Sequence, residues 1–132
     1  MTAQARTASV SIDRTPADVY GYLADPATFP EWSFFTSMEP AGDGRWRAGL
    51  PDGRTALLSF SGRNELGVLD HDVRVGDATV HVPMRVVPNG GGSEVLLTAF
   101  RRPGMSDEEF AADVAAVEKD LAALKALLEG RS

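Results

Sequence analysis

The clearest pattern of apolar and polar positions lies between Ser106 and Glu129. At spacings of four or three positions this stretch carries Phe110, Val114, Val117, Leu121, Leu124 and Leu128. Such spacing places them along one face of a helix about 36 Å long. Ser106 and Glu109 form a capping box at its start, and Gly130 is expected to end it in a left-handed conformation. The opposite, polar side is expected to carry Asp113, Lys119, Asp120, Lys125 and Glu129.

The residues before this helix follow a different pattern. From residue 34 to residue 100, short apolar runs alternate with turn signals, as is typical of an antiparallel meander. Ahead of the meander, Val10 and Ile12 mark a first strand, Thr15-Pro16-Ala17-Asp18 begins a short helix, and Pro26 begins a further helical turn. We therefore expect an α+β fold with about seven strands in one curved sheet, two short helices after the first strand, and a long C-terminal helix.

The two-residue turn at Gly76-Asp77 predicts which side chains share a face of the sheet, because cross-strand partners point the same way. One face then carries Leu69, His71, Val73, Val75, Val80, Val82, Met84 and Val86. The other carries Asp70, Asp72, Arg74, Thr79, His81, Pro83 and Arg85. A one-residue slip would mix these sets, so their separation supports the register.

Two further turns extend the apolar face. Tight turns at Gly62-Arg63 and at residues 51–53 add Phe60, Leu58, Ala56, Leu50, Ala48 and Trp46. The glycine run at residues 90–92 precedes a strand pattern, which favours a hairpin turn over a phosphate-binding loop. The register of residues 94–100 stays open, with either Val95 and Leu97 or Leu96 and Phe100 pointing inward.

Composition limits the class of protein. The 132 residues carry a net charge of −6, with 43% hydrophobic and 24% charged residues, which suits one globular domain over residues 1–132. The negative charge argues against nucleic acid and anionic membrane as partners. The chain has no cysteine, and residues 1–7 lack the apolar core of a signal peptide. We expect a cytoplasmic protein.

The candidate chemistry centres on His71, the imidazole on the apolar face. Three roles stay open: a core histidine bonded to a backbone carbonyl, a polar group in a ligand cavity, and a general acid or base. His81 is expected to form a surface ion pair with Asp72 across the strand. Two histidines on opposite faces do not make a metal site, and we expect no cofactor. Trp32 and Trp46 are either core residues or ligand contacts.

Several segments resemble the START-like, or SRPBCC, superfamily. They are Thr15-Pro16-Ala17-Asp18-Val19-Tyr20, Leu23-Ala24-Asp25-Pro26 and Pro30-Glu31-Trp32. The resemblance covers nearly the whole chain and implies a helix-grip fold, in which a curved sheet wraps a long helix around a deep apolar cavity. The superfamily includes polyketide cyclases, aromatases and lipid-transfer domains, so the resemblance implies a fold more than an activity.

Our leading hypothesis is a cofactor-free protein that binds a small, largely apolar, lipid- or polyketide-like molecule between sheet and helix. The expected ligand-binding residues are Trp32, Trp46, Leu58, Phe60, Leu69, His71, Val82, Met84, Phe110, Val114, Val117 and Leu121. The alternative is a polyketide cyclase, aromatase or dehydratase that uses His71 as acid or base, with Arg54 as a second polar group. A protein-interaction module is a third possibility, and the sequence leaves monomer or homodimer open.

Overall fold

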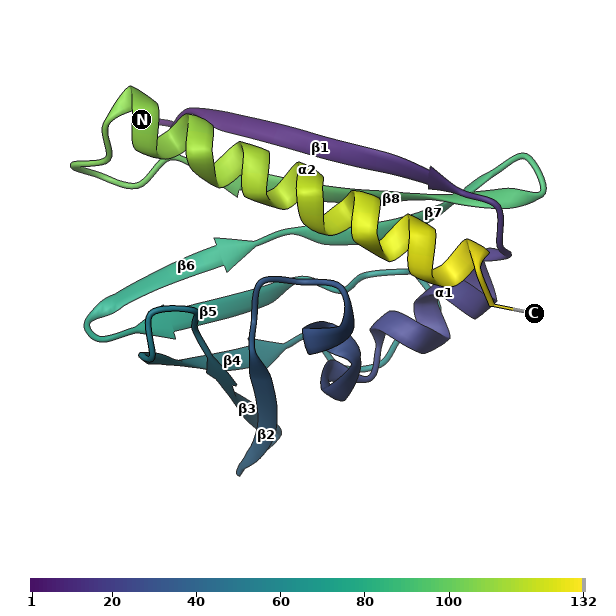
Figure 1. Cartoon of the computed structure of the whole chain (residues 1–132), viewed down its shortest axis with the longest axis horizontal. Coiled ribbons are helices and arrows are strands. Elements are labelled where there is room, and N and C mark those ends of the chain that lie inside the picture. The colour runs from purple at the N-terminus through teal and green to yellow at the C-terminus, as the bar shows by residue number, and fades with distance from the viewer. Residues whose placement is uncertain (132) are drawn as a thin grey trace.

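The computed structural model describes residues 1–131, so position 132 of the expected domain lies outside the described residues. In chain order the elements are β1 (Ala5–Ile12), α1 (Pro16–Leu23), the 3-10 helix η1 (Pro26–Glu31), β2 (Ser37–Gly42), β3 (Arg45–Gly49), β4 (Thr55–Phe60), β5 (His71–Val75), β6 (Ala78–Val82), β7 (Met84–Asn89), β8 (Gly92–Phe100) and α2 (Asp107–Glu129). This order confirms the predicted α+β helix-grip arrangement (Figure 1).

The strands differ from the prediction in number and grouping. They form a three-stranded sheet in the order β1-β8-β7 and a five-stranded sheet in the order β2-β3-β4-β5-β6, both antiparallel. The chain passes between the two sheets at Pro83, which lies between β6 and β7 and has no N–H to donate to a ladder. One expected long strand is therefore divided in two.

The hairpin register at Gly76-Asp77 is confirmed. His71 pairs with Val82 and Val73 with Val80, while the N–H of Leu69 donates to the carbonyl of Met84 at 2.8 Å. The expected tight turn at Gly62-Arg63 is wrong, because a loop over residues 61–70 connects β4 to β5 and Phe60 pairs with His71. A tight turn would have paired Phe60 with Glu65, which lies six residues before its actual partner His71. Because this difference is even and alternate residues of a strand share a face, the predicted faces of the sheet are still correct.

Helix α2 begins as predicted and ends differently. Both hydrogen bonds of the capping box between Ser106 and Glu109 are present, at 2.9 and 3.1 Å. Gly130 has φ −80° and ψ −8°, so the expected left-handed end is wrong and the glycine continues the right-handed turn. The shorter helix α1 has its own cap, since the Thr15 side chain accepts from the N–H of Asp18.

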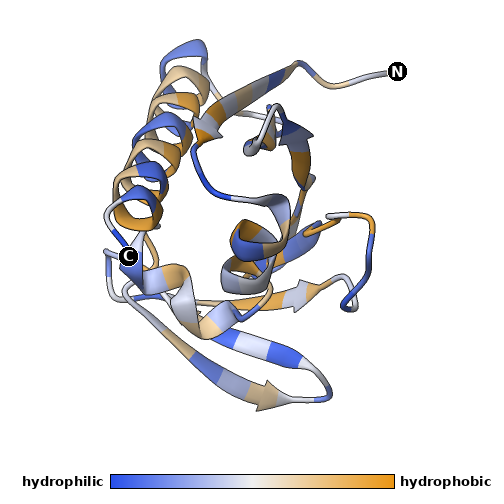
Figure 2. Ribbon diagram, turned by 90° about the vertical axis from the view of Figure 1, so that its right-hand side faces the viewer, coloured by the Kyte–Doolittle hydropathy of each residue, from blue (hydrophilic) through white to orange (hydrophobic). Residues whose placement is uncertain are grey.

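The long helix packs on the three-stranded sheet, mainly on β1 and then on β8. On β8 the residues that point inward are Val95 and Leu97, which are buried, and this settles the register left open above. In the end-on view α2 stands on one side of the interior and the strands lie around its other sides (Figure 2). Both α1 and η1 lie at the end of the interior where α2 ends (Figure 1).

Candidate functional site

His71 lies at the start of β5 on the inner face of the five-stranded sheet and is only 6% exposed. Its Nδ1 lies 2.9 Å from the carbonyl oxygen of Leu69, which can only accept, so Nδ1 carries the proton and donates. Burial lowers the pKa of His71, which keeps the imidazole neutral. The nitrogen Nε2 is then left with a free lone pair, for which we find no partner among residues 1–131.

An aromatic cluster surrounds this histidine. The ring of Phe29 lies 4.9 Å from Trp32, 5.4 Å from Phe60 and 5.9 Å from His71, and Phe60 lies 5.1 Å from His71. Helix η1 supplies Phe29 and is capped at its C-terminal end by Trp32, so it brings these rings against strands β4 and β5. We call Phe29, Trp32, Phe60 and His71 the aromatic cluster.

The predicted site residues of the sheet all lie on one inner face, but they differ in burial. Leu58, Leu69 and Met84 are buried core residues. The remaining ones, Trp46, Phe60 and Val82, stay partly exposed, as does their neighbour Val73. An inward-facing residue that water still reaches is not covered by the protein's own side chains. The accessible part of the inner face is therefore apolar.

The predicted helix residues divide into two sets. Leu121 is buried in the core, and Val117 packs against that core while remaining partly exposed. Phe110 and Val114 lie apart from the core cluster and line a pocket of about 450 Å³ next to β1. That pocket is completed by Gln4, Arg6, Arg101, Asp107, Ala111 and Glu118. The structure thus does not bring Phe110 and Val114 to the aromatic cluster.

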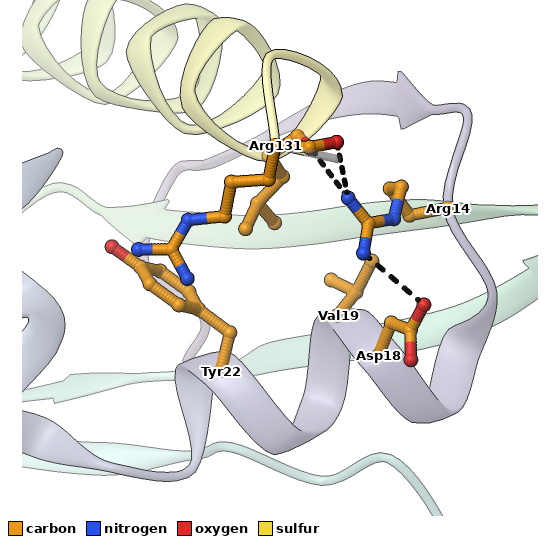
Figure 3. Close-up of a pocket in the computed structure, with 6 residues that line it drawn as sticks. Arg14, Asp18, Val19, Tyr22 and Arg131 are labelled. Atoms are coloured by element: carbon orange, nitrogen blue, oxygen red, sulfur yellow. Dashed lines mark hydrogen bonds and ion pairs between the residues drawn. The ribbon is translucent and has the colours of Figure 1, made fainter.

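A second pocket, of about 250 Å³, lies between α1 and the end of α2 (Figure 3). Its Arg14 donates to the carbonyls of Leu128 and Arg131 and pairs with Asp18. The guanidinium of Arg131 lies 4.8 Å above the ring of Tyr22. A cation at the C-terminal end of a helix satisfies its free carbonyls and its dipole, so these contacts hold α2 against the start of the chain.

Asp120 is the residue that sequence reasoning misplaced. It was expected on the polar side of α2, yet it is half-buried and faces the loop after η1, where Oδ2 accepts the backbone N–H of Phe34 at 3.3 Å. Burial raises the pKa of Asp120 to about 6, and the Phe34 bond opposes this only in part. The spacing along the sequence indicates this placement, because Asp120 lies three positions after Val117 and four before Leu124, on the same side of the helix as these apolar residues.

Two expected polar contacts have different outcomes. His81 Nδ1 lies 2.8 Å from Asp72 Oδ1 on the outer face, as predicted. Arg54 does not face His71; its side chain is exposed and pairs with Asp52 at 2.8 Å, so the suggestion of a second polar group there is wrong. Arg54 lies beside the turn before β4, whereas His71 pairs with the last residue of that strand.

Metal and membrane features were also sought. Nowhere in residues 1–131 do three or more His, Asp or Glu side chains come together as a metal site would require. None of the helices in the described part of the chain has the length and apolar character needed to cross a bilayer.

Comparison with known proteins places this geometry in a family. The family model for polyketide cyclases, dehydrases and lipid transport proteins matches residues 4–129. The chain belongs to this family. A comparison with curated protein sequences finds no significant match.

Solved structures share the fold of this family member at low sequence identity. Protein MLL2253 from Mesorhizobium loti is similar with a TM-score of 0.80 at 14% identity, covering 98% of this chain and 99% of that one. A START superfamily protein from Mycobacterium smegmatis gives 0.77 at 13%, covering 95% and 97%. DynU16, from the dynemicin biosynthetic locus, gives 0.76 at 18%, covering 96% of this chain and 47% of its own.

Proposed function

We propose that this protein binds a small, largely apolar molecule between the five-stranded sheet and α2. The observation that carries the proposal is the inner face itself, where Trp46, Phe60, Val73 and Val82 point inward yet remain partly exposed. Val117 of α2 is partly exposed as well. Covering such surface contributes about 25 cal/mol for each Å² removed from water, so a molecule of modest size gains useful affinity there.

The family supports the same reading in general terms, because its description joins polyketide chemistry with lipid transport. Both activities require that a water-insoluble molecule be held away from solvent.

The outer face offers less support for a protein-interaction role. Its Asp70 forms an ion pair with Arg85, and its Asp72 lies within hydrogen-bond distance of His81. No exposed apolar patch is needed for the proposed function.

A neutral fluorescent probe, N-phenyl-1-naphthylamine, tests the proposal, because its emission rises in an apolar site. Val82→Gln places an amide on the inner face and is expected to weaken probe binding about fivefold, for a loss of about 1 kcal/mol of apolar contact. Val87→Gln is the matched control, since Val87 is an exposed valine on β7 whose partner is Glu94. Absent binding, or equal effects of the two substitutions, would refute the proposed site.

A cyclase or dehydratase activity is the second candidate, and His71 is the observation that favours it. A neutral imidazole whose Nδ1–H is fixed by Leu69 offers Nε2 as a general base near neutral pH. Asp120, whose pKa is raised to about 6, is a second titratable group, on the side of α2 that faces the loop after η1. Native mass spectrometry of protein purified from its own host distinguishes the candidates. A carrier releases its ligand unchanged on unfolding, whereas an enzyme releases a cyclised or dehydrated product.

A further inference from the structure

Strand β1 forms one edge of the three-stranded sheet, and in the described chain it pairs with β8 alone (Figure 1). In an antiparallel pair the N–H and C=O groups of one residue point the same way, and successive residues point in opposite ways. The carbonyl of Ser11 accepts from Lys125 of α2 at 2.7 Å, so the backbone groups of Ser11 point away from β8. Those of Ala5, Thr7 and Ser9 point the same way and have no hydrogen-bond partner among residues 1–131. The first part of β1 therefore offers an open row of donors and acceptors.

This open edge lacks the features that usually keep a strand from pairing with another chain, namely proline, bulges and covering loops. The eight residues of β1 contain no proline and pair with β8 without a shift of register. Strand β2 differs, because it contains Pro40 and its register shifts there. Strand β7, at the other edge of the three-stranded sheet, is covered by the loop before β5, where the carbonyl of Gly67 accepts the N–H of Val86 at 2.9 Å. The edge of β1 can therefore accept a further strand.

A hollow beside this edge leaves room for the side chains of an added strand. The pocket of about 450 Å³ described above lies between α2 and the first residues of β1, and Phe110 and Val114 give it an apolar wall. Glu118, which also lines it, lies seven positions before Lys125 and so on the same side of α2, the side that reaches the β1 edge. Asp120, which faces the loop after η1, lies on the other side of the helix. The pocket is thus separate from the interior between α2 and the five-stranded sheet.

The charges of this pocket are only partly paired within the chain. Arg101 forms an ion pair with Asp107. Arg6 and Glu118 line the pocket as well, and neither has an ion pair or a side-chain hydrogen bond among residues 1–131. An acidic side chain that reaches Arg6 and a basic one that reaches Glu118 would complement both. Side chains two positions apart on a strand share a face, so one added strand can carry the two charges.

A second copy of this chain does not fit the edge. Its own β1 would lie about 4.8 Å from the first, and its α2 would lie over that strand, because α2 packs mainly on β1. Packed helices need axes about 8 to 10 Å apart, so the two copies of α2 would collide. An extended peptide brings no helix and avoids this collision.

We propose that the open edge of β1 binds an extended segment of a partner protein by strand addition, and that this segment carries a basic and an acidic side chain two positions apart. The backbones of Ala5, Thr7 and Ser9 supply the main-chain hydrogen bonds. Arg6 and Glu118 select the charges of the segment. This surface lies outside the proposed ligand site, so the two are tested separately.

The probe is the peptide acetyl-Thr-Lys-Thr-Glu-Thr-Val-Thr-amide, and its binding is followed by proton–nitrogen NMR. In an antiparallel added strand its two charged side chains face the pocket and its second threonine pairs with Thr7. The amide N–H signals of Thr7 and Ser9 are expected to move downfield. At saturation these two N–H groups are expected to exchange with solvent about tenfold more slowly, because each gains a hydrogen bond. The N–H of Ala8 points to β8 and is expected to stay unchanged.

Two N-methylated versions of the peptide separate strand addition from attraction between charges alone. Methylation at the second threonine removes an N–H that points to β1 and is expected to abolish binding. Methylation at the glutamate removes an N–H that points away from β1 and is expected to leave binding intact. These controls need no variant of the protein.

Two variants of the protein test the same contacts from the other side. Thr7→Pro removes an outward N–H without breaking the ladder to β8, and it is expected to abolish binding while the protein stays folded. Arg6→Gln is expected to weaken binding about threefold, as is typical of an exposed ion pair. Arg47→Gln, at an exposed arginine of β3, is the control with the same change of charge.

No binding of the peptide by the wild type, or equal binding of the two methylated peptides, overturns the inference. A dimer that forms with rising concentration and that Thr7→Pro dissociates also overturns it, because a second copy then occupies the edge. Neither result bears on probe binding between sheet and helix, so the proposed function stands or fails by its own test.

Discussion

Asp120 offers the sharpest test of how the loop after η1 meets α2. Its carboxylate is half-buried beside Phe34, a residue that is itself 49% exposed and stacks on buried Phe35 at 4.6 Å. Asp120→Asn removes the charge and keeps an oxygen that can accept the Phe34 N–H. We expect this substitution to stabilise the protein at pH 7 and to change how its stability depends on pH.

The magnitude follows from the pKa. Burial raises the pKa of Asp120 from 3.8 to about 6, a shift worth about 3 kcal/mol if it were fully expressed. Because the side chain is only half-buried, solvent screening reduces this to about 1 kcal/mol. The folded state binds this proton more tightly, so the contribution of Asp120 to stability is greatest below about pH 4 and is lost as the pH rises to about 6. At pH 7 the variant gains about 1 kcal/mol, or about 4 °C in Tm.

The assay is urea unfolding at pH steps from 3.5 to 8, plotted as the stability of variant minus wild type. Burial also lowers the pKa of His71, but this residue is present in both proteins, so its contribution cancels in the difference. Asp113→Asn is the control, because Asp113 lies two turns earlier on α2 and pairs with Arg102 at 4.0 Å. A flat difference for Asp120→Asn would refute the raised pKa. Lower stability of the variant at pH 7 would show that the charge itself stabilises the loop.

Two further predictions concern the outer face and the junction of the sheets. Arg85 donates hydrogen bonds to both carboxylate oxygens of Asp70 and lowers the pKa of this carboxyl group to about 2. Asp70→Asn should therefore lower the free energy of unfolding by about 1 kcal/mol at pH 7. It should also remove the loss of stability that this group causes in the wild type as the pH falls from about 4 to about 2. If urea unfolding showed the same loss of stability below about pH 4 in Asp70→Asn as in the wild type, this prediction would be contradicted. Gly67 has φ +74°, and a Cβ at this position would lie 2.2 Å from the carbonyl oxygen of Val86. Gly67→Ala should therefore lower the free energy of unfolding by more than about 2 kcal/mol. Gly53 is the control, because it has φ +88° but open space around it, so Gly53→Ala should lower the free energy of unfolding by about 1 kcal/mol. Equal losses of Tm in the two glycine variants would refute the role of this contact.

Local rules predicted the parts of this fold that depend on neighbouring residues. The register of β5 and β6 follows from a two-residue turn, and the cap of α2 follows from two side chains three positions apart. The loop between β4 and β5 could not be read in this way. Its shape depends on Asn64, whose side chain accepts from the N–H groups of Leu66 and Val68 and donates to the carbonyls of Gly62 and Val68.

The candidate site was predicted in outline and missed in detail. Alternation placed His71 on the inner face, but its partner Leu69 emerged only with the backbone geometry. Asp120 was read as a surface residue, because the segment that buries it arrives from eighty-six residues away in sequence. The indole N–H of Trp32 is buried without a hydrogen-bond partner among residues 1–131, and no pattern in the sequence indicates this. Hydrogen-bond satisfaction depends on what surrounds a group in three dimensions, and periodicity does not record that.

The pairing of β1 with β8 sets the order in which the chain can fold during synthesis. Ile12 pairs with Ser93 and Ala5 with Phe100, so the strand translated early waits for partners 81 to 95 residues later. At roughly 5 to 20 residues per second, that delay lasts about 4 to 19 seconds. Helix α2, which packs on β1, follows later still. The hairpin of β5 and β6 forms from local contacts in the meantime, so the apolar inner face exists before the elements that cover it. That interval is when a chaperone would be needed most.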